Sequence, residues 1–251
     1  MTITGLRVVG VLLKSTDVVT ASDLRSLCPP AISVHATRLQ LWPGEGLTAL
    51  WPRVKSACEI INDCIPEVIV FACASSTFAG GDSLDRAVAT RIEELTCRPV
   101  ITAARALIKG VQRSGMRRVL LVSPYSDDID TSIAALLAGI GVQVMATLSI
   151  RYLEIFQPGF LSTFAGAKNR LVDPSWVHRL VLDRLKNLSA VDGVVVACTG
   201  LRISEVICDL ERDSLLPVVA ANQAVAAEVQ RILGLAIPVH GYGRLLEVPS
   251  H

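Results

Sequence analysis

The chain has 251 residues, of which 51% are hydrophobic, 19% are charged and only 4% are aromatic. This composition excludes a disordered chain and predicts an aliphatic core for one or two domains. The net charge of +1, without a basic stripe, argues against a nucleic-acid-binding protein. No apolar run reaches the roughly 18 residues that span a bilayer, and no signal peptide is recognisable. Seven cysteines without a CxxC pair predict a reducing, cytoplasmic location.

Short β-branched runs alternate with helical patterns along the chain. We expect strands at Arg7–Leu13, Ser33–Leu41, Glu67–Ala72, Arg118–Ser123, Gln143–Ile150, Gly193–Ala197 and Pro217–Ala220. We expect helices at Gly46–Cys64, Leu84–Leu95, Ala103–Ser114, Asp128–Ala138, Ser175–Asn187, Ile203–Asp213 and Asn222–Leu233. Asp17 and Ser22–Asp23 are candidate caps of a further, earlier helix, and Asp173–Pro174 is typical of a helix start. The strand-like runs are apolar throughout, which favours parallel sheets covered on both faces in an α/β fold.

An internal repeat predicts two similar lobes. Residues 99–113 and 217–231 are identical at seven of fifteen positions, and Val68–Ser75 aligns with Gly193–Gly200 in the same order. We therefore expect two α/β lobes, each a parallel sheet flanked by helices, related by a pseudo-twofold axis, with an active site in the cleft between them. We place the lobes at residues 1–115 and 116–220, with residues 221–251 packing back on the first lobe.

Two cysteines stand at matching places in this repeat. Cys73 and Cys198 each follow a buried strand and precede a loop that leads to a helix. Ligands of parallel α/β sheets sit beyond the carboxyl ends of the strands, and helix N-termini favour thiolates and carboxylates. The alternative is that both are structural, because free cysteines are often buried. The remaining five cysteines lack this context, and we interpret them as structural.

Two thiols on opposite sides of one carbon suit a particular chemistry. One thiolate removes a proton beside a carboxylate, or adds to the carbon, and the other thiol delivers a proton from the opposite face. Hydroxyl and N–H donors then stabilise the enolate-like charge, and such donors follow the cysteines at Ser75, Ser76, Thr199 and Gly200. This chemistry needs no cofactor and no metal, and the four scattered histidines have no metal-ligand spacing.

The sequence resembles the aspartate/glutamate racemase superfamily, in the branch of maleate cis–trans isomerase, arylmalonate decarboxylase and the racemase-like proteins of ectoine utilisation. The resemblance covers nearly the whole chain and rests on five motifs in order: Gly10–Asp17, Phe71–Ser76, Val122–Tyr125, Ala197–Arg202 and Gly241–Leu245. It implies two α/β lobes with the active site between them, and a homo-oligomer. It also implies that Cys73 and Cys198 are the catalytic thiols. Ser75, Tyr125, Thr199 and Gly200 would hold a substrate carboxylate.

Asp17 departs from the resemblance to maleate isomerases, which typically carry asparagine at this place. An amide can donate to a substrate carboxylate, whereas an ionised carboxylate can only accept. Two like charges about 4 Å apart cost about 4 kcal/mol at an effective dielectric of 20. Asp17 therefore predicts a substrate with a hydrogen-bond donor where maleate has its second carboxylate, unless it serves as a helix N-cap.

Together these observations predict a cofactor-independent isomerase or racemase of a small carboxylic acid. Arylmalonate decarboxylases typically have only the second cysteine, so the pair favours an isomerase or racemase over a decarboxylase. Maleate isomerisation proper, an arylmalonate-type decarboxylase and a non-catalytic protein that binds small carboxylates remain as alternatives. Arg202 and Arg244 could bind a substrate carboxylate or form structural salt bridges.

Overall fold

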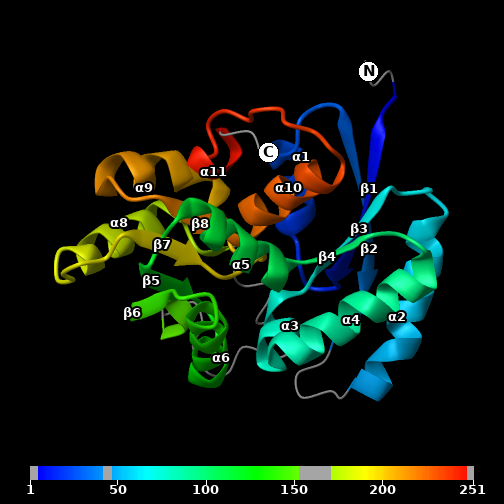
Figure 1. The fold of residues 1–251 in the computed structure, drawn as a ribbon, viewed down its shortest axis with the longest axis horizontal. Coiled ribbons are helices and arrows are strands. Elements are labelled where there is room, and N and C mark those ends of the chain that lie inside the picture. The colour runs from blue at the N-terminus through cyan, green and yellow to red at the C-terminus, as the bar shows by residue number, and fades with distance from the viewer. Residues whose placement is uncertain (1–4, 42–46, 153–170, 248–251) are drawn as a thin grey trace.

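The computed structural model of the chain describes residues 5–41, 47–152 and 171–247. Its strands form two four-stranded sheets in which all neighbours are parallel. The strand order is β2-β1-β3-β4 in the first sheet and β6-β5-β7-β8 in the second. The two sheets therefore have the same topology. Figure 1 shows the sheets side by side with helices around them. The predicted fold of two similar α/β lobes is confirmed.

The first lobe is built from the N-terminal half of the chain. Its strands are β1 (Arg7–Lys14), β2 (Ile32–Leu39), β3 (Val68–Ala72) and β4 (Val100–Thr102). Its helices are α1 (Thr20–Leu27), α2 (Leu47–Asn62), α3 (Ala74–Ala79), α4 (Gly81–Thr96) and α5 (Ala103–Ser114). All five residues of β3 are buried, as a central strand covered on both faces requires.

The second lobe repeats this plan. Its strands are β5 (Arg118–Ser123), β6 (Gln143–Ser149), β7 (Gly193–Val196) and β8 (Val218–Ala220). Its helical segments are α6 (Asp127–Ala138), η1 (Ile150–Tyr152), α8 (Pro174–Leu185), η5 (Ser204–Val206), α9 (Ile207–Ser214), α10 (Ala221–Ile232) and α11 (Arg244–Glu247). The predicted cap at Asp173 is confirmed, because its carboxylate accepts a hydrogen bond of 2.8 Å from the Ser175 N–H and Pro174 occupies the first turn.

Three differences from the predicted elements bear on the site. The residues after Cys73 form the short helix α3, whereas the sequence predicted a polar turn before a helix at Leu84. Ser22 and Asp23 lie inside α1 and do not cap it, because the helix already begins at Thr20. The helix predicted over Ile203–Asp213 begins as the 3-10 segment η5 and continues as α9. The expected start of the second helix at Gly46 falls outside the described residues.

The core is continuous between the two sheets. Residues of both lobes share one buried cluster, in which α10 packs against α5 and α1. Ten successive residues of α10, from Ala221 to Gln230, are buried, so this helix is covered on all sides. Figure 1 shows α5 and α10 between the sheets. α10 contacts α1, β3 and β4 of the first lobe and also β8 of the second, and α11 contacts β8.

We predict that Gly10 is required by close packing on β1. A Cβ there would lie 2.7 Å from Cγ1 of Ile61 and 2.9 Å from Cδ1 of Ile69, which is too close for undisturbed packing. Gly10→Ala should lower the free energy of unfolding by about 1–3 kcal/mol. Urea unfolding measures this change. Gly5→Ala is the matched control because a Cβ at Gly5 meets nothing within 4 Å, and equal stability of the two variants would contradict the prediction.

Candidate active site

A cavity of about 60 Å³ opens where the carboxyl ends of β1, β3, β5 and β7 converge. Its lining comes from the last residues of these strands and the segments that follow them. The lining residues are Lys14, Thr16, Asp17, Ala72, Cys73, Ala74, Ser75, Tyr125, Cys198, Thr199 and Gly200. Seven of the eight residues proposed from the sequence as a site therefore meet in one place, and Ser76 is the exception. Ligands of parallel α/β sheets are expected at this edge.

Cys73 forms the wall that belongs to the first lobe. It directly follows β3, is 4% exposed and stands at the N-cap position of α3. Its sulfur lies 3.0 Å from the hydroxyl of Ser76 and 3.9 Å from that of Ser75. Ser76 thus contacts the cavity indirectly, through the Cys73 sulfur. The two hydroxyls can donate hydrogen bonds to this sulfur when it carries negative charge.

Cys198 lines the cavity from the second lobe. It lies two residues beyond β7, is 4% exposed, and is followed by Thr199 and Gly200 in a turn. Its side chain hydrogen-bonds with that of Tyr125, which follows β5. Burial raises the pKa of Tyr125 well above its usual value, and the neighbouring Cys198, Cys73 and Asp17 act in the same direction. The phenol therefore stays protonated and is available as a hydrogen-bond donor.

The turn after Cys198 is held by side chains from α1 and α10. The carbonyl oxygen of Thr199 accepts a hydrogen bond of 3.0 Å from the hydroxyl of Thr20 and one of 2.8 Å from Nδ2 of Asn222. The carboxylate of Asp23 accepts from Asn222 at 2.9 Å and from Ser204 at 3.0 Å. This network, which we call the Thr199 clamp, fixes the second lobe's thiol relative to α1 of the first lobe.

Asp17 lies two residues before Val19, the N-cap of α1, and also lines the cavity. Its Oδ1 accepts hydrogen bonds of 2.9 Å from the N–H groups of Val19 and Thr20, and its Oδ2 accepts one of 2.6 Å from the Thr20 hydroxyl. The N-terminus of α1 therefore compensates much of its negative charge. Asp17 is therefore not the helix N-cap expected as its alternative role, although its carboxylate accepts hydrogen bonds from the backbone where α1 begins. Asp17 is 6% exposed and still borders the cavity.

Two polar lining residues were missed by the sequence analysis. Lys14 ends β1, and Thr16 lies in the following turn with a buried hydroxyl that has no hydrogen-bond partner among the described residues. The sequence did hold a sign that these two residues belong to the site, because both lie within the Gly10–Asp17 motif at the end of the first strand. Arg202 and Arg244, by contrast, face acidic partners: Arg202 pairs with Glu205 at 2.7 Å, and Arg244 lies 3.9 Å from Glu211.

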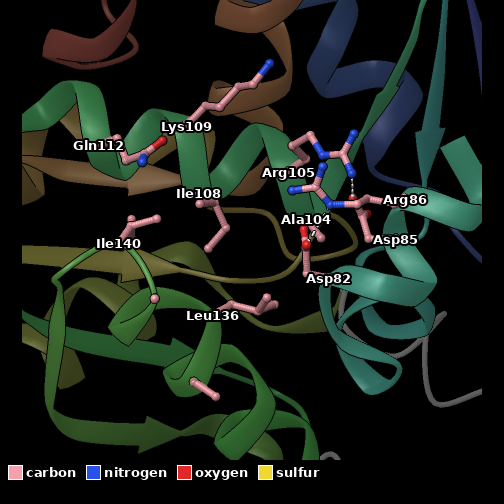
Figure 2. Close-up of a pocket in the computed structure, with 12 residues that line it drawn as sticks. Asp82, Asp85, Arg86, Ala104, Arg105, Ile108, Lys109, Gln112, Leu136 and Ile140 are labelled. Atoms are coloured by element: carbon pink, nitrogen blue, oxygen red, sulfur yellow. Dashed lines mark hydrogen bonds and ion pairs between the residues drawn. The ribbon is translucent and has the colours of Figure 1, made fainter.

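A larger cavity of about 450 Å³ lies elsewhere, between α4, α5 and α6, and contains none of the paired thiols. Figure 2 shows Asp82, Asp85, Arg86 and Arg105 gathered at one end of this cavity, with Lys109 apart from them. These charges pair with one another, since Arg86 lies 2.6 Å from Asp82 and Arg105 lies 3.0 Å from Asp85. Size alone therefore does not identify a reactive site, and both thiols singled out from the sequence line the smaller cavity.

Neither a metal site nor a membrane span emerges from the part of the chain that the structure describes. No group of three or more histidine, cysteine, aspartate or glutamate side chains there is arranged to hold a metal ion. No described helix combines the length and apolarity needed to cross a bilayer. All seven cysteines are free thiols, and Cys64 and Cys97 are the exposed ones.

Comparison with known proteins places the chain in a family. The family model for arylmalonate decarboxylase matches residues 22–246, so the chain belongs to this enzyme family. It is 28% identical to a maleate isomerase of Nocardia farcinica, over 98% of both chains. It is 29% identical to an arylmalonate decarboxylase of Bordetella bronchiseptica, over 69% of this chain and 68% of that one.

Solved structures agree with the family. A cysteine-to-serine mutant of the Nocardia farcinica maleate cis–trans isomerase, with a covalently bound succinylcysteine intermediate, matches with a TM-score of 0.82 and 26% identity, over 97% of this chain and 99% of that one. Unliganded arylmalonate decarboxylase matches with a TM-score of 0.78 and 25% identity, over 96% and 98% of the two chains. The resemblance inferred from the motifs is thereby confirmed.

We predict that Asp23 makes stability depend on pH. Burial raises the pKa of Asp23 to about 6, although hydrogen bonds from Asn222 and Ser204 oppose the rise. An exposed aspartate has a pKa of about 3.9, so protonation favours the folded state. The contribution of Asp23 to the free energy of unfolding is fully present below about pH 4 and is lost as the pH rises to about 6.

Urea unfolding of the wild type and Asp23→Asn across pH 4–7 measures this contribution. The free energy of unfolding of the wild type should fall relative to that of the variant between pH 4 and pH 6 and then level off. Asp63→Asn, at an exposed position, is the matched control. A difference between wild type and Asp23→Asn that stays constant over this range would contradict the assignment.

Proposed function

We propose that the chain is a cofactor-independent isomerase or racemase of a small carboxylic acid, with Cys73 and Cys198 as its two catalytic thiols. The observation that carries the proposal is that both buried sulfurs belong to residues lining one small cavity, each from a different lobe. A guest with few heavy atoms would contact both walls. The sites of enzymes of this kind must offer one group to take a proton and another to return it.

Proton transfer between the two faces follows from this arrangement. One thiolate takes the proton from the carbon beside the carboxylate, and the electron pair of the broken C–H bond moves into an enolate-like system. The thiol of the other cysteine then gives its proton to the opposite face of that carbon. Reversal of the two roles returns the first enantiomer, so each cysteine alternates between base and acid.

The donors around the cavity would stabilise the charge that develops during this step. The hydroxyl of Ser75, the phenol of Tyr125 and the backbone N–H groups of Thr199 and Gly200 are candidates to hold the substrate carboxylate. Donors already in place cost little reorganisation when charge develops, which is why such groups contribute strongly to catalysis. Ser76 would act through its contact of 3.0 Å with the Cys73 sulfur.

Cis–trans isomerisation is the second candidate, favoured by the covalent succinylcysteine in the related Nocardia enzyme. One thiolate adds to the double bond of an unsaturated acid, forming an S–C bond while the π electrons pass to the neighbouring carbon. Rotation about the resulting single bond and expulsion of the thiolate release the trans acid. A decarboxylase is the third candidate, supported by the family match, with Cys198 as the proton donor to the carbanion left by loss of CO₂.

We predict that loss of either sulfur abolishes turnover. Cys73→Ser and Cys198→Ser should each lower kcat/KM by at least about 100-fold, since a positioned acid or base contributes about 10²–10⁴. Cys97→Ser is the matched control at an exposed cysteine and should leave the rate unchanged.

The substrate can be found by NMR in deuterated solvent over a panel of small acids. Deuterium at a carbon beside the carboxylate supports racemisation, conversion of a cis to a trans acid supports isomerisation, and CO₂ release from a disubstituted malonate supports decarboxylation. Wild-type turnover on the true substrate in both cysteine variants would refute the two-thiol scheme.

A further inference from the structure

Asp130 has no part in the proposed chemistry, yet hydrogen bonds link it to Tyr125. It belongs to α6 and is 7% exposed, and Ser123, the last residue of β5, is fully buried. The Ser123 hydroxyl donates a hydrogen bond of 2.5 Å to Oδ1 of Asp130 and accepts one of 3.0 Å from the N–H of Tyr125. One hydroxyl group therefore connects a buried carboxylate to the backbone of a residue that lines the cavity.

The hydroxyl of Ser123 has a single hydrogen, and Asp130 determines where that hydrogen points. A serine that accepts from the N–H two residues further along the chain stabilises a tight turn, which here carries Tyr125. The hydroxyl can accept in this way while its hydrogen points to Asp130. A buried hydroxyl hydrogen without an acceptor is costly, so loss of the carboxylate would turn the hydroxyl toward another acceptor and weaken the turn.

The place of Tyr125 matters because this residue touches groups of both lobes. Its side chain hydrogen-bonds with that of Cys198, and its ring centroid lies 6.5 Å from that of Phe78 with 58° between the ring planes. Phe78 belongs to α3, the helix that has Cys73 at its N-cap. A shift of the turn at Tyr125 would therefore move the phenol that faces the Cys198 sulfur.

The first lobe uses the same pair of groups after its own first strand. There the Thr20 hydroxyl donates a hydrogen bond of 2.6 Å to Oδ2 of Asp17. In the first lobe the carboxylate precedes the helix and the hydroxyl lies on it, whereas in the second lobe the carboxylate lies on the helix. Asp17 lines the cavity, and Asp130 is not among the described residues that do so. Asp130 is thus placed to hold another residue and not to contact a substrate.

We propose that Asp130 is a positioning residue, which acts through Ser123 to hold the Tyr125 phenol against the Cys198 sulfur. This inference rests on the proposed function, in which Tyr125 and Cys198 act on the substrate. The acceptor oxygen of Asp130 carries the role, because the Ser123 hydroxyl needs an acceptor, whether or not that acceptor is charged.

Alkylation of the free protein by iodoacetamide tests the proposal without a substrate. A phenol that donates to the Cys198 sulfur favours its thiolate, so Asp130→Ala should move the pH profile of Cys198 alkylation to higher pH. By peptide mass spectrometry at neutral pH, the ratio of Cys198 to Cys73 alkylation should fall by about tenfold or more, as expected for a lost hydrogen bond to a charged group. Asp130→Asn should stay within about twofold of the wild type, since its amide oxygen still accepts from Ser123.

A double-mutant cycle with Tyr125→Phe shows whether Asp130 acts through the phenol. In the Tyr125→Phe background, Asp130→Ala should change the alkylation ratio by less than about twofold, because the donor is already absent. Asp85→Ala is the matched control, since it removes another buried helix carboxylate, 4% exposed on α4 and outside the described lining of this cavity. It should lower stability in urea and leave the alkylation ratio unchanged.

Ser123→Ala removes the same link without a change on α6 and should reproduce the effect of Asp130→Ala, which keeps the proposal testable if the latter does not fold. Independent effects of Asp130→Ala and Tyr125→Phe would overturn the proposal. A loss in Asp130→Asn as large as in Asp130→Ala would also overturn it, because the charge and not the acceptor would then act. So would faster alkylation of Cys198 with an unchanged pH profile, because Asp130→Ala would then only open the site.

Turnover separates this inference from the proposed function. On the acid that the wild type converts, Asp130→Ala should lower kcat by about tenfold or more, since a donor that faces the reacting groups is displaced, and Asp130→Asn should keep most of the rate. The expected alkylation results without turnover of any acid by the wild type would retain the role of Asp130 and refute the enzyme chemistry. Turnover that depends on both cysteines but not on Asp130 would retain the chemistry and refute the positioning role.

Discussion

The arrangement of the site depends on hydrogen bonds to one backbone atom, the carbonyl oxygen of Thr199. This oxygen follows Cys198 in the second lobe, and its donors are Thr20 of α1 and Asn222 of α10. The hydroxyl of Thr20 also lies 2.6 Å from Oδ2 of Asp17, so its single hydrogen is shared between the two acceptors and links the start of α1 to the turn that carries the thiol. The shared core holds the two lobes together, and this clamp adds direct hydrogen bonds that position the turn after Cys198 against α1. The chemistry proposed here needs the distance between the two sulfurs to be held.

The two lobes repeat one strand order, and they place different side chains at equivalent points of the cavity. Cys73 and Cys198 both follow the third strand of their lobe, and Lys14 and Tyr125 lie at or just after the end of the first. The first lobe contributes a cation and hydroxyls, whereas the second contributes a phenol that hydrogen-bonds its own cysteine. The two similar lobes therefore line the cavity with unlike groups. Such asymmetry is what a site needs to hold a substrate in one orientation.

Much of the fold could be predicted from the sequence, because apolar strands and helix starts are local signals and the internal repeat is visible by comparing two segments of the chain. The repeat located Cys73 and Cys198 at equivalent ends of strands, and the motif around Asp17 pointed to the same edge. The double role of Asp17 could not be resolved, since capping depends on where α1 begins. Lys14 was missed because a lysine at a strand end is usually solvated, and only the register with β3 shows that it lies level with Cys73. The Thr199 clamp joins residues about 180 and 23 positions apart, so no local pattern reveals it.

The central claim is that Cys73 and Cys198 face each other across one cavity, and a short dithiol-bridging reagent tests it most directly. Burial raises the pKa of Cys28 to about 12, and burial, aided by Glu59, raises that of Cys58 to about 11, so neither thiol competes near neutral pH. Treatment with a trivalent phenylarsenical, followed by proteolysis and mass spectrometry, should yield one arsenic linking the peptides that contain Cys73 and Cys198. Recovery of these two cysteines only as separate, unbridged thiols would show that no single small molecule can touch both and would contradict the account.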